Sequence, residues 1–120
     1  MMTDPIVCDS FVVVEWTASV DNGPERPIAA LHVHHADDEA WIVQTGRLGV
    51  QVGDTVQEAG PGESVLVRRG VPHTYWNAGS EPARYLLVMT PRLHHLIQEL
   101  HSGERSDYAE IFREHQSELL

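Results

Sequence analysis

Three histidines and three acidic residues lie within the eight positions from His32 to Glu39, and an apolar run follows them. Alternate residues of a β-strand share a face, so His32 and His34 point the same way while His35 points to the opposite side. If the chain then turns into a neighbouring strand, Glu39 returns beside the two imidazoles. Two imidazoles and a carboxylate on adjacent strands suit a divalent transition metal, although an exposed acidic loop would contain the same residue types.

A second segment adds another potential ligand. His73 follows a glycine-containing turn and opens a stretch with two aromatic residues. Protein metal sites usually have three or four protein ligands, and His32, His34, Glu39 and His73 together supply four. We therefore expect one divalent transition metal per chain. Three histidines and a carboxylate are compatible with Fe, Mn, Ni, Co, Cu or Zn, so the residue types do not identify the metal.

The two segments resemble the paired sequence motifs of the cupin superfamily. The first motif contains His-x-His, then Glu and Gly, and the second contains two Gly, then His and Asn. The matching positions are His32, His34, Glu39 and Gly46 in the first segment and Gly62, Gly70, His73 and Asn77 in the second. The sequence departs from the family pattern at Arg26, where the family has Gly, and at Arg68, where it has Pro. Those family residues shape turns and strand entry, so both departures concern local geometry more than metal binding.

The resemblance implies a fold and an activity. It implies an all-β protein with a small cupin-type barrel, a double-stranded β-helix or jelly roll. The segments look most like small single-domain bacterial cupins related to quercetin 2,3-dioxygenase. In those enzymes the metal binds the enolate oxygen of the substrate and presents it to O2, which would make Glu39 both a ligand and the catalytic general base. The implied activity is a metal-dependent oxygenase for a small aromatic, flavonol-like or enol-bearing substrate.

A non-oxidative cupin is the alternative function. It would be a polyketide cyclase or isomerase that uses the metal as a Lewis acid, or a module that binds a small molecule without turnover. Zn as the only native metal would favour this class, because Zn has no redox chemistry. Small cupins commonly form dimers, so the resemblance also implies a homodimer. The partner expected in the site is a small-molecule substrate.

Strand parity predicts which side chains line a substrate pocket. Trp41 and Val43 share the face of the glutamate, and Tyr75 and Asn77 share the face of the histidine in the second segment. An aromatic wall of Trp41 and Tyr75 beside a metal would favour a planar aromatic ligand. The alternative is that Trp41 simply fills the interior, because a barrel of this size leaves little space for a ligand.

The elements that must position these residues follow from the hydrophobic pattern. Short β-branched and aromatic runs between Gly, Pro, Asn and Asp clusters predict strands. We expect strands at residues 11–20, 28–35, 40–44, 47–52, 55–58, 64–68, 73–77 and 83–89. Many short strands at close spacing favour a sandwich or barrel. We expect the barrel to span about residues 11–90 of a single domain that covers residues 1–120.

After Thr90 the hydrophobic period changes to about 3.6 residues, which predicts two short helices in residues 91–120. Thr90 can cap the first helix with Pro91 at its first position, and Gly103 ends it. A second helix can begin at Ser106. The residues of its apolar face are Tyr108, Ile111, Phe112 and Leu119. Helices this short are unstable alone, so each must pack on the barrel or on another subunit.

Charge and cysteine content limit the partners and the compartment. Eighteen acidic and eight basic residues give a formal net charge of -10, so we expect no nucleic-acid or membrane partner. The single cysteine, Cys8, cannot form an intramolecular disulfide. No signal-peptide pattern or apolar run of about eighteen residues occurs, so we expect a cytoplasmic protein.

The remaining polar clusters are predicted to lie at the surface. Asp37 and Asp38 belong to a turn near the rim of the site, together with His35. Arg68 and Arg69 are expected to form surface ion pairs, although they could also clamp an anionic substrate. The histidines expected to be surface or interface residues are His94, His95, His101 and His115.

Overall fold

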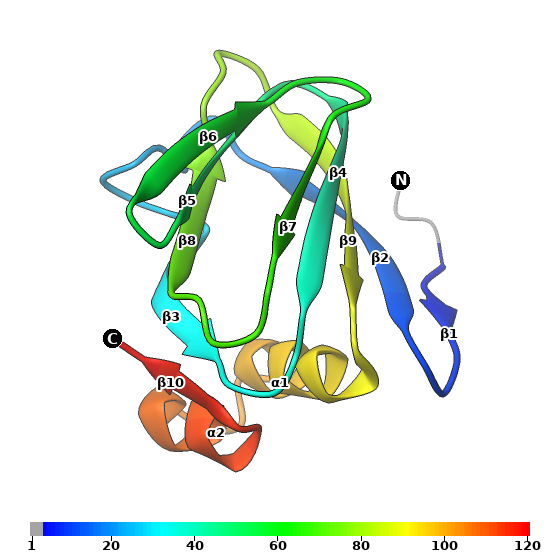
Figure 1. Ribbon diagram of the computed structural model, residues 1–120, viewed down its shortest axis with the longest axis vertical. Helices are drawn as coiled ribbons and strands as arrows, with labels where there is room; N and C mark the ends of the chain where they lie inside the picture. The colour runs from blue at the N-terminus through cyan, green and yellow to red at the C-terminus, as the bar shows by residue number, and fades with distance from the viewer. Residues whose placement is uncertain (1–3) are drawn as a thin grey trace.

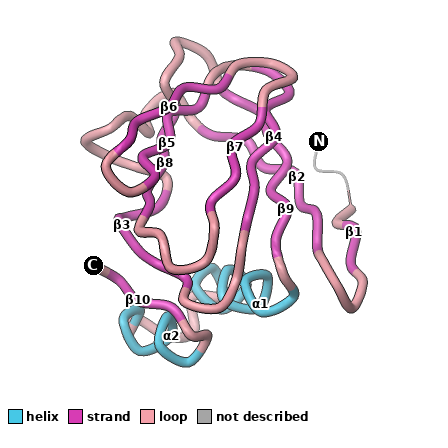
Figure 2. The backbone as a smooth tube through the Cα atoms, viewed as in Figure 1, coloured by secondary structure: helices cyan, strands magenta, loops and turns pink. Residues whose placement is uncertain are grey.

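The computed structural model describes residues 4–120, which form ten strands and two helices (Figures 1 and 2). The strands are β1 (Ile6–Val7), β2 (Val12–Ala18), β3 (Ala29–His34), β4 (Glu39–Thr45), β5 (Leu48–Val52), β6 (Thr55–Ala59), β7 (Ser64–Val67), β8 (His73–Asn77), β9 (Ala83–Met89) and β10 (Ser117–Leu119). The helices are α1 (Pro91–His101) and α2 (Tyr108–Glu114). All elements except β1 and β10 lie close to the positions that the hydrophobic pattern predicts.

All the strand pairs are antiparallel, and they form two five-stranded sheets. The strand orders are β1-β2-β9-β4-β7 and β10-β3-β8-β5-β6. The two sheets face each other as a jelly roll, and both helices lie at one end of it (Figure 1). This arrangement confirms the predicted barrel with two short C-terminal helices.

The register of the strands keeps the histidines on the inner face. Apolar side chains alternate with exposed ones along the strands, so the inward-facing set forms one core between the sheets. A slip by one residue would turn that whole set outward, which is why burial holds the register. The pairing of β3 with β8 places His32 opposite His73, after an irregularity that follows Ala29. Two segments that lie far apart in the sequence therefore meet at one place.

The first helix begins where the sequence predicts. The Thr90 hydroxyl accepts the backbone N–H of Leu93 at 3.2 Å, and Pro91 occupies the first turn. Leu93 and Leu96 are each only 1% exposed because the apolar face of α1 packs on the barrel. The sequence left open whether this face covers the barrel or another subunit, and the structure shows that it covers the barrel.

The end of the chain differs from the prediction. The N-cap of α2 is Asp107 rather than Ser106, and the helix ends before Leu119. Gln116 has a φ of 53°, which breaks the helical path, and the chain then pairs with β3 as β10. Leu119 therefore lies in a strand and not on a helical face. β1 and β10 were not predicted, because runs of two and three residues carry too little pattern to distinguish them from loop.

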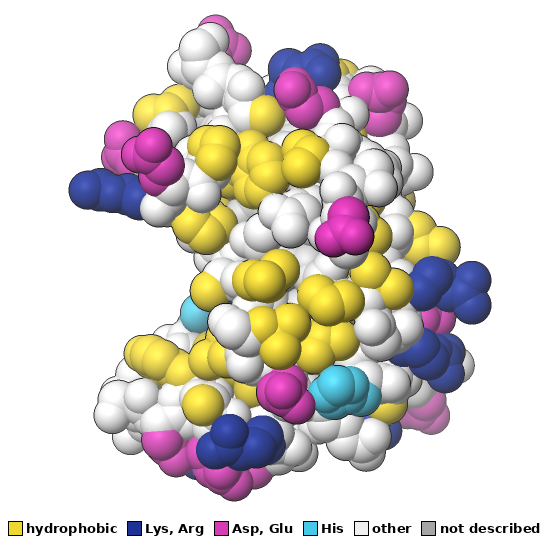
Figure 3. Space-filling view, turned by 60° about the vertical axis from the view of Figure 1, so that its left-hand side comes forward, with side chains coloured by type: hydrophobic (Ala, Val, Ile, Leu, Met, Phe, Trp, Pro, Cys, Tyr) yellow, Lys and Arg dark blue, Asp and Glu magenta, His cyan; other side chains and the backbone are white. Residues whose placement is uncertain are grey.

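Most charged side chains lie at the surface. On the face that Figure 3 shows, they lie mainly around the edge, and hydrophobic side chains gather in the middle of that face. Arg68 and Arg69 both pair with Asp38, at 3.8 and 3.1 Å, as the sequence predicts. Hydrogen bonds from Arg69 lower the pKa of Asp38 to about 2. Within residues 4–120, neither helix has the length and apolar character needed to cross a membrane.

Candidate metal centre

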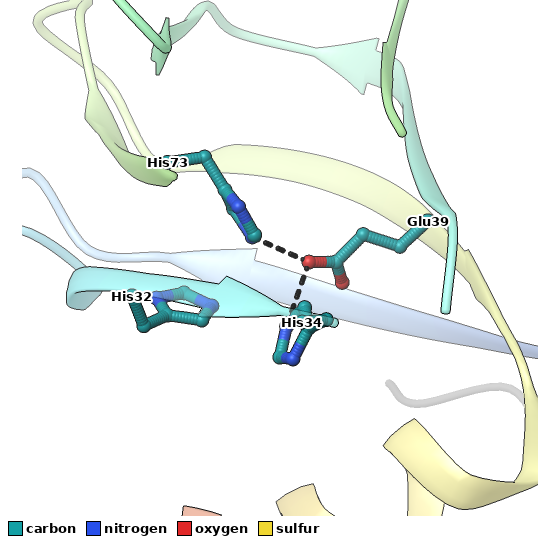
Figure 4. A group of neighbouring side chains, drawn as sticks. All are labelled: His32, His34, Glu39 and His73. Atoms are coloured by element: carbon teal, nitrogen blue, oxygen red, sulfur yellow. Dashed lines mark hydrogen bonds and ion pairs between the residues drawn. The ribbon is translucent and has the colours of Figure 1, made fainter. Parts of the chain in front are cut away.

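The four predicted ligand side chains converge at the end of the barrel nearest the helices. His32 and His34 come from β3, Glu39 begins β4, and His73 begins β8 (Figure 4). All four residues are buried, and one potential ligand atom from each lies within 4.8 Å of the others. Metal bonds to histidine nitrogen or carboxylate oxygen are about 2.0–2.2 Å long, so two ligand atoms on opposite sides of an ion are about 4 Å apart. The cluster therefore has dimensions suited to a single metal ion.

Backbone carbonyls orient two of the imidazoles. The Nδ1 of His32 lies 2.6 Å from the carbonyl oxygen of Ala30, and the Nδ1 of His73 lies 3.0 Å from that of Val71. A carbonyl oxygen can only accept, so each Nδ1 must carry the hydrogen and donate it. In a neutral ring the Nε2 atom is then unprotonated. Both rings thus present Nε2 to the centre of the cluster, which is the arrangement that a metal-binding histidine requires.

A side chain from the end of the chain orients the third imidazole. The hydroxyl of Ser117, on β10, donates its single hydrogen to the carbonyl oxygen of His115 at 3.1 Å. Its oxygen is then free to accept the Nδ1–H of His34, at a distance of 2.7 Å. The two side chains are 83 positions apart in the sequence and both are buried. His34 therefore has the same tautomer as the other two histidines.

The electrostatics of the cluster call for a cation. The Oε1 atom of Glu39 lies 2.7 Å from Nε2 of His73 and 3.2 Å from Nε2 of His34. Burial alone would raise the pKa of Glu39, but hydrogen bonds and charge from His34 and His73 lower it to about 2, so the carboxylate is charged at neutral pH. In the metal-free protein those hydrogen bonds need a proton on Nε2 of His34 and His73, which is the position that a metal would take. Burial, helped by the neighbouring imidazoles, lowers the pKa of His32 to about 4, which keeps that ring neutral. The lone pairs of the unprotonated nitrogens and of the carboxylate oxygens repel one another unless a positive charge lies among them. A divalent metal would supply that charge.

An apolar cavity of about 90 Å³ adjoins the cluster. His32, His34 and Glu39 form its polar end, and Trp41 and Tyr75, the two aromatic residues expected in a substrate pocket, form part of its wall. The indole of Trp41 and the ring of Tyr75 are in contact, with centroids 5.1 Å apart. Both residues are buried, so they fill the barrel interior and line the cavity at the same time.

Two residues expected in the pocket do not line it. Val43 and Asn77 are buried on the predicted faces, but each lies four residues beyond a cluster residue, which is about 13 Å along a strand. The amide of Asn77 instead donates to the carbonyl oxygens of Ala18 and Glu81, and its own oxygen accepts the N–H of Gly79. Asn77 therefore holds a turn at the opposite end of the barrel. Strand parity gave the correct face but carried no information on distance along the strand.

One side of the cavity, which we call its outer wall, is formed by residues that the sequence did not mark as pocket residues. Its members come from β2 and the two C-terminal helices: Trp16, Leu93, Leu96, Leu100, His101 and Phe112. The apolar period of α1 was a signal for a buried face, but it did not reveal that this face borders a cavity. His101, expected to be a surface or interface residue, is exposed at the mouth, with its ring centroid 5.5 Å from that of Trp16. No local signal marked Ser117.

Asp37 also differs from the expectation of an exposed turn residue. It is only 6% exposed, and its carboxylate lies 3.6 Å from the guanidinium of Arg92, on α1. The pair links the turn between β3 and β4, which crosses from one sheet to the other, to the first turn of α1. The turn that brings Glu39 beside the histidines is therefore held against the helix that covers the cavity.

Comparison with known proteins identifies the family. The Cupin domain family matches residues 20–89, and a search of curated proteins found no match. A Thermus thermophilus protein of known structure is 23% identical, with a TM-score of 0.60 over 75% of this chain and 83% of that one. A Klebsiella pneumoniae protein with a double-stranded β-helix domain is 26% identical, with a TM-score of 0.58 over 72% of this chain and 69% of that one.

A third solved structure, described as a sugar phosphate isomerase of the cupin superfamily from Silicibacter pomeroyi, is 24% identical with a TM-score of 0.57. The aligned part covers 68% of this chain but only 50% of that protein. At this level of identity the likeness shows the fold alone. The closer resemblance to quercetin dioxygenase-like proteins stays a prediction. Because the family match spans more than half of the chain and the fold is the expected jelly roll, the protein belongs to the cupin family.

Proposed function

We propose that the protein is a metal-dependent oxygenase that binds one divalent transition metal through His32, His34, Glu39 and His73. The substrate would be a small enol-bearing or aromatic molecule in the adjoining cavity. The observation that carries this proposal is the position of the cluster, which forms the polar end of an otherwise apolar cavity. Such a cavity holds a substrate next to a metal while limiting the access of water.

The residues of the chain supply the remaining parts of the reaction. Glu39 is charged and buried, so its carboxylate can accept the proton of an enol or hydroxyl group that enters the cluster. Trp41 and Tyr75 can stack on a planar substrate. When bound, Fe, Mn, Ni, Co or Cu supplies redox chemistry with O2, whereas Zn supplies only Lewis acidity.

A non-oxidative function is the second candidate. It is favoured by the similarity in fold to a protein described as a sugar phosphate isomerase, and by a buried carboxylate that could move a proton between substrate atoms. Apart from a bound metal, the cavity offers a phosphate group no cationic partner, because none of the eight arginines lines it and the sequence has no lysine. A cyclase, an isomerase for an uncharged substrate, or a binding module without turnover would remain compatible.

Elemental analysis of protein purified without added metal separates the two candidates. We expect about one equivalent of a redox-active metal per chain and O2 consumption with an enol-bearing substrate. Zn as the only metal, with no O2 consumption after loading with Fe, Mn or Ni, would instead establish the non-oxidative class. Absence of any metal, even after incubation with each ion, would overturn the oxygenase and any cyclase or isomerase that uses the metal, and would leave only the binding module. The homodimer implied by the family resemblance is a separate proposal, which sedimentation velocity can test.

A further inference from the structure

We infer that the cavity takes a small, uncharged ligand with oxygen atoms at both ends, and that the C-terminal segment of this chain enforces that limit. The inference rests on the proposed function, because it specifies the ligand of the same site. Four features of the cavity carry it: its volume, the absence of cationic side chains from its wall, its unpaired hydrogen-bond donors and the origin of its outer wall.

The volume limits the ligand to about one ring. The cavity measures about 90 Å³, and a single water needs about 10–15 Å³ on the same measure, so there is room for roughly six to nine water-sized groups. Pockets for drug-sized ligands are about 300–1,000 Å³. A flavonol carries a fused ring pair and an additional aryl ring, so it does not fit while the helices remain in place. The flavonol-like substrate suggested by the family resemblance is therefore too large for this cavity.

The charges exclude an anionic ligand. The cavity wall contains no arginine within residues 4–120, and most arginines are paired with carboxylates elsewhere, as Arg84 is with Glu15. At the polar end, a metal held by the cluster would supply positive charge that it shares with the carboxylate of Glu39. A phosphate or carboxylate placed against the apolar wall would lose its hydration without gaining a cationic partner. A ligand that enters without a charged group avoids that penalty.

The aromatic residues of the wall leave polar hydrogens for an acceptor. The indole N–H of Trp41 is buried without a hydrogen-bond partner in the described part of the chain. The hydroxyl of Tyr75, which also lines the cavity, lies 2.9 Å from that of Tyr85. When Tyr85 donates the hydrogen that the two share, the Tyr75 hydrogen remains available. A buried donor left unpaired costs about 1–3 kcal/mol, which a carbonyl or ether oxygen of a ligand would offset. The ligand therefore carries an acceptor oxygen in addition to the oxygen that faces the histidines.

The outer wall belongs to parts of the chain beyond the family match. Leu93, Leu96 and Leu100 of α1 and Phe112 of α2 line the cavity, and all lie after residue 89. Phe112 also lies edge-on against His32, with ring centroids 5.5 Å apart. The helices thus close the barrel directly over the cluster. The ligand size is set by these helices and not by the elements shared with the family.

Calorimetric titration of the full-length, Zn-loaded protein tests the ligand class. The probes are maltol, 3-hydroxyflavone and fructose 6-phosphate. Maltol and 3-hydroxyflavone share the same hydroxy-ketone group but differ in size, and fructose 6-phosphate carries a dianion. We expect maltol to bind more tightly than either of the others by about tenfold or more, because it alone combines the allowed size and charge.

A pair of leucine variants tests the role of the helices. Leu100 is half-buried at the mouth of the cavity, so Leu100→Ala widens the opening with a limited effect on the core. We expect it to raise the affinity for 3-hydroxyflavone relative to that for maltol by about tenfold. Leu66→Ala, on the exposed face of β7, removes the same atoms away from the cavity and should change neither affinity.

The outcomes separate a failure of the metal site from a failure of the inferred ligand class. Zinc content is measured first, and a protein that binds no Zn overturns the proposed metal site itself. If Zn binds but fructose 6-phosphate or 3-hydroxyflavone binds as tightly as maltol, the inferred ligand class is wrong. Failure of all three probes to bind the Zn-loaded protein also overturns it. An unchanged probe preference in Leu100→Ala overturns the role assigned to the helices.

Discussion

Ser117→Ala should weaken metal binding even though Ser117 is not a proposed ligand. The serine hydroxyl lies between the Nδ1–H of His34 and the carbonyl oxygen of His115, and the residue is only 2% exposed. Alanine removes the acceptor and leaves the ring nitrogen buried with nothing to donate to. The imidazole can then rotate or change tautomer, and its Nε2 atom is no longer held toward the cluster.

Two physical arguments give the size of the expected loss in metal affinity. A buried donor left without its acceptor costs about 1–3 kcal/mol. At about 1.4 kcal/mol per tenfold, this corresponds to a loss of roughly five- to 150-fold in affinity if the bound state carries the whole penalty. Loss of an outer hydrogen bond to a metal-binding histidine typically weakens binding by about 10–100-fold. The two estimates overlap, so we expect the dissociation constant for Zn²⁺ to rise by one to two orders of magnitude.

Competition with a chromophoric chelator measures the change in the Zn²⁺ dissociation constant. Urea unfolding of the metal-free protein shows how much of the cost of the unpaired donor appears as a loss of stability instead. Ser64→Ala is the matched control, because it removes the same hydroxyl from an exposed position at the start of β7. Ser117→Thr keeps a hydroxyl at the site and should retain most of the affinity. The role assigned to Ser117 is refuted if Ser117→Ala binds Zn²⁺ as tightly as the natural protein does.

Three further predictions concern the cluster and its supports. His34→Ala should remove most bound metal while His35→Ala, outside the cluster, should not, and equal losses by elemental analysis would contradict the assigned strand faces. His32 has a pKa of about 4 in the fold against an ordinary 6.5, so the unfolded chain takes up a proton first as the pH falls. Metal-free protein should therefore lose up to about 3 kcal/mol of its free energy of unfolding as the pH falls from 6.5 to 4. A free energy of unfolding that stays constant in urea titrations across this range would refute this prediction. Arg92→Ala leaves the buried carboxylate of Asp37 without its cationic partner and should lower stability by about 1–2 kcal/mol at pH 7. Asp37→Asn should lose less, and an equal or larger loss in Asp37→Asn would show that charge pairing is not the cause.

Much of the cluster was predictable because strand geometry is local. The spacing of His32 and His34 places both on one face of any strand. The sequence predicts that Glu39 returns on the adjacent strand, whereas the structure places it on β4 in the opposite sheet, which faces β3 across the barrel. His73 was a candidate only as a further potential ligand, and the second family motif supported it, since nothing near it in the sequence points to β3. The Thr90–Pro91 start of α1 was equally local, because a helix cap depends on adjacent residues.

The sequence by itself therefore predicted a barrel or sandwich, the four candidate ligands and the aromatic residues on their faces, because periodicity and residue spacing act over short stretches of chain, and the family resemblance implied the jelly roll. Tertiary structure decided which side chains share the cavity. Asn77 has the correct parity but lies too far along its strand, while Ser117 reaches His34 across 83 positions. The apolar faces of α1 and α2 could have covered any apolar surface. Their packing over the cluster sets the volume of the cavity, since contacts between distant segments depend on the arrangement of the whole chain.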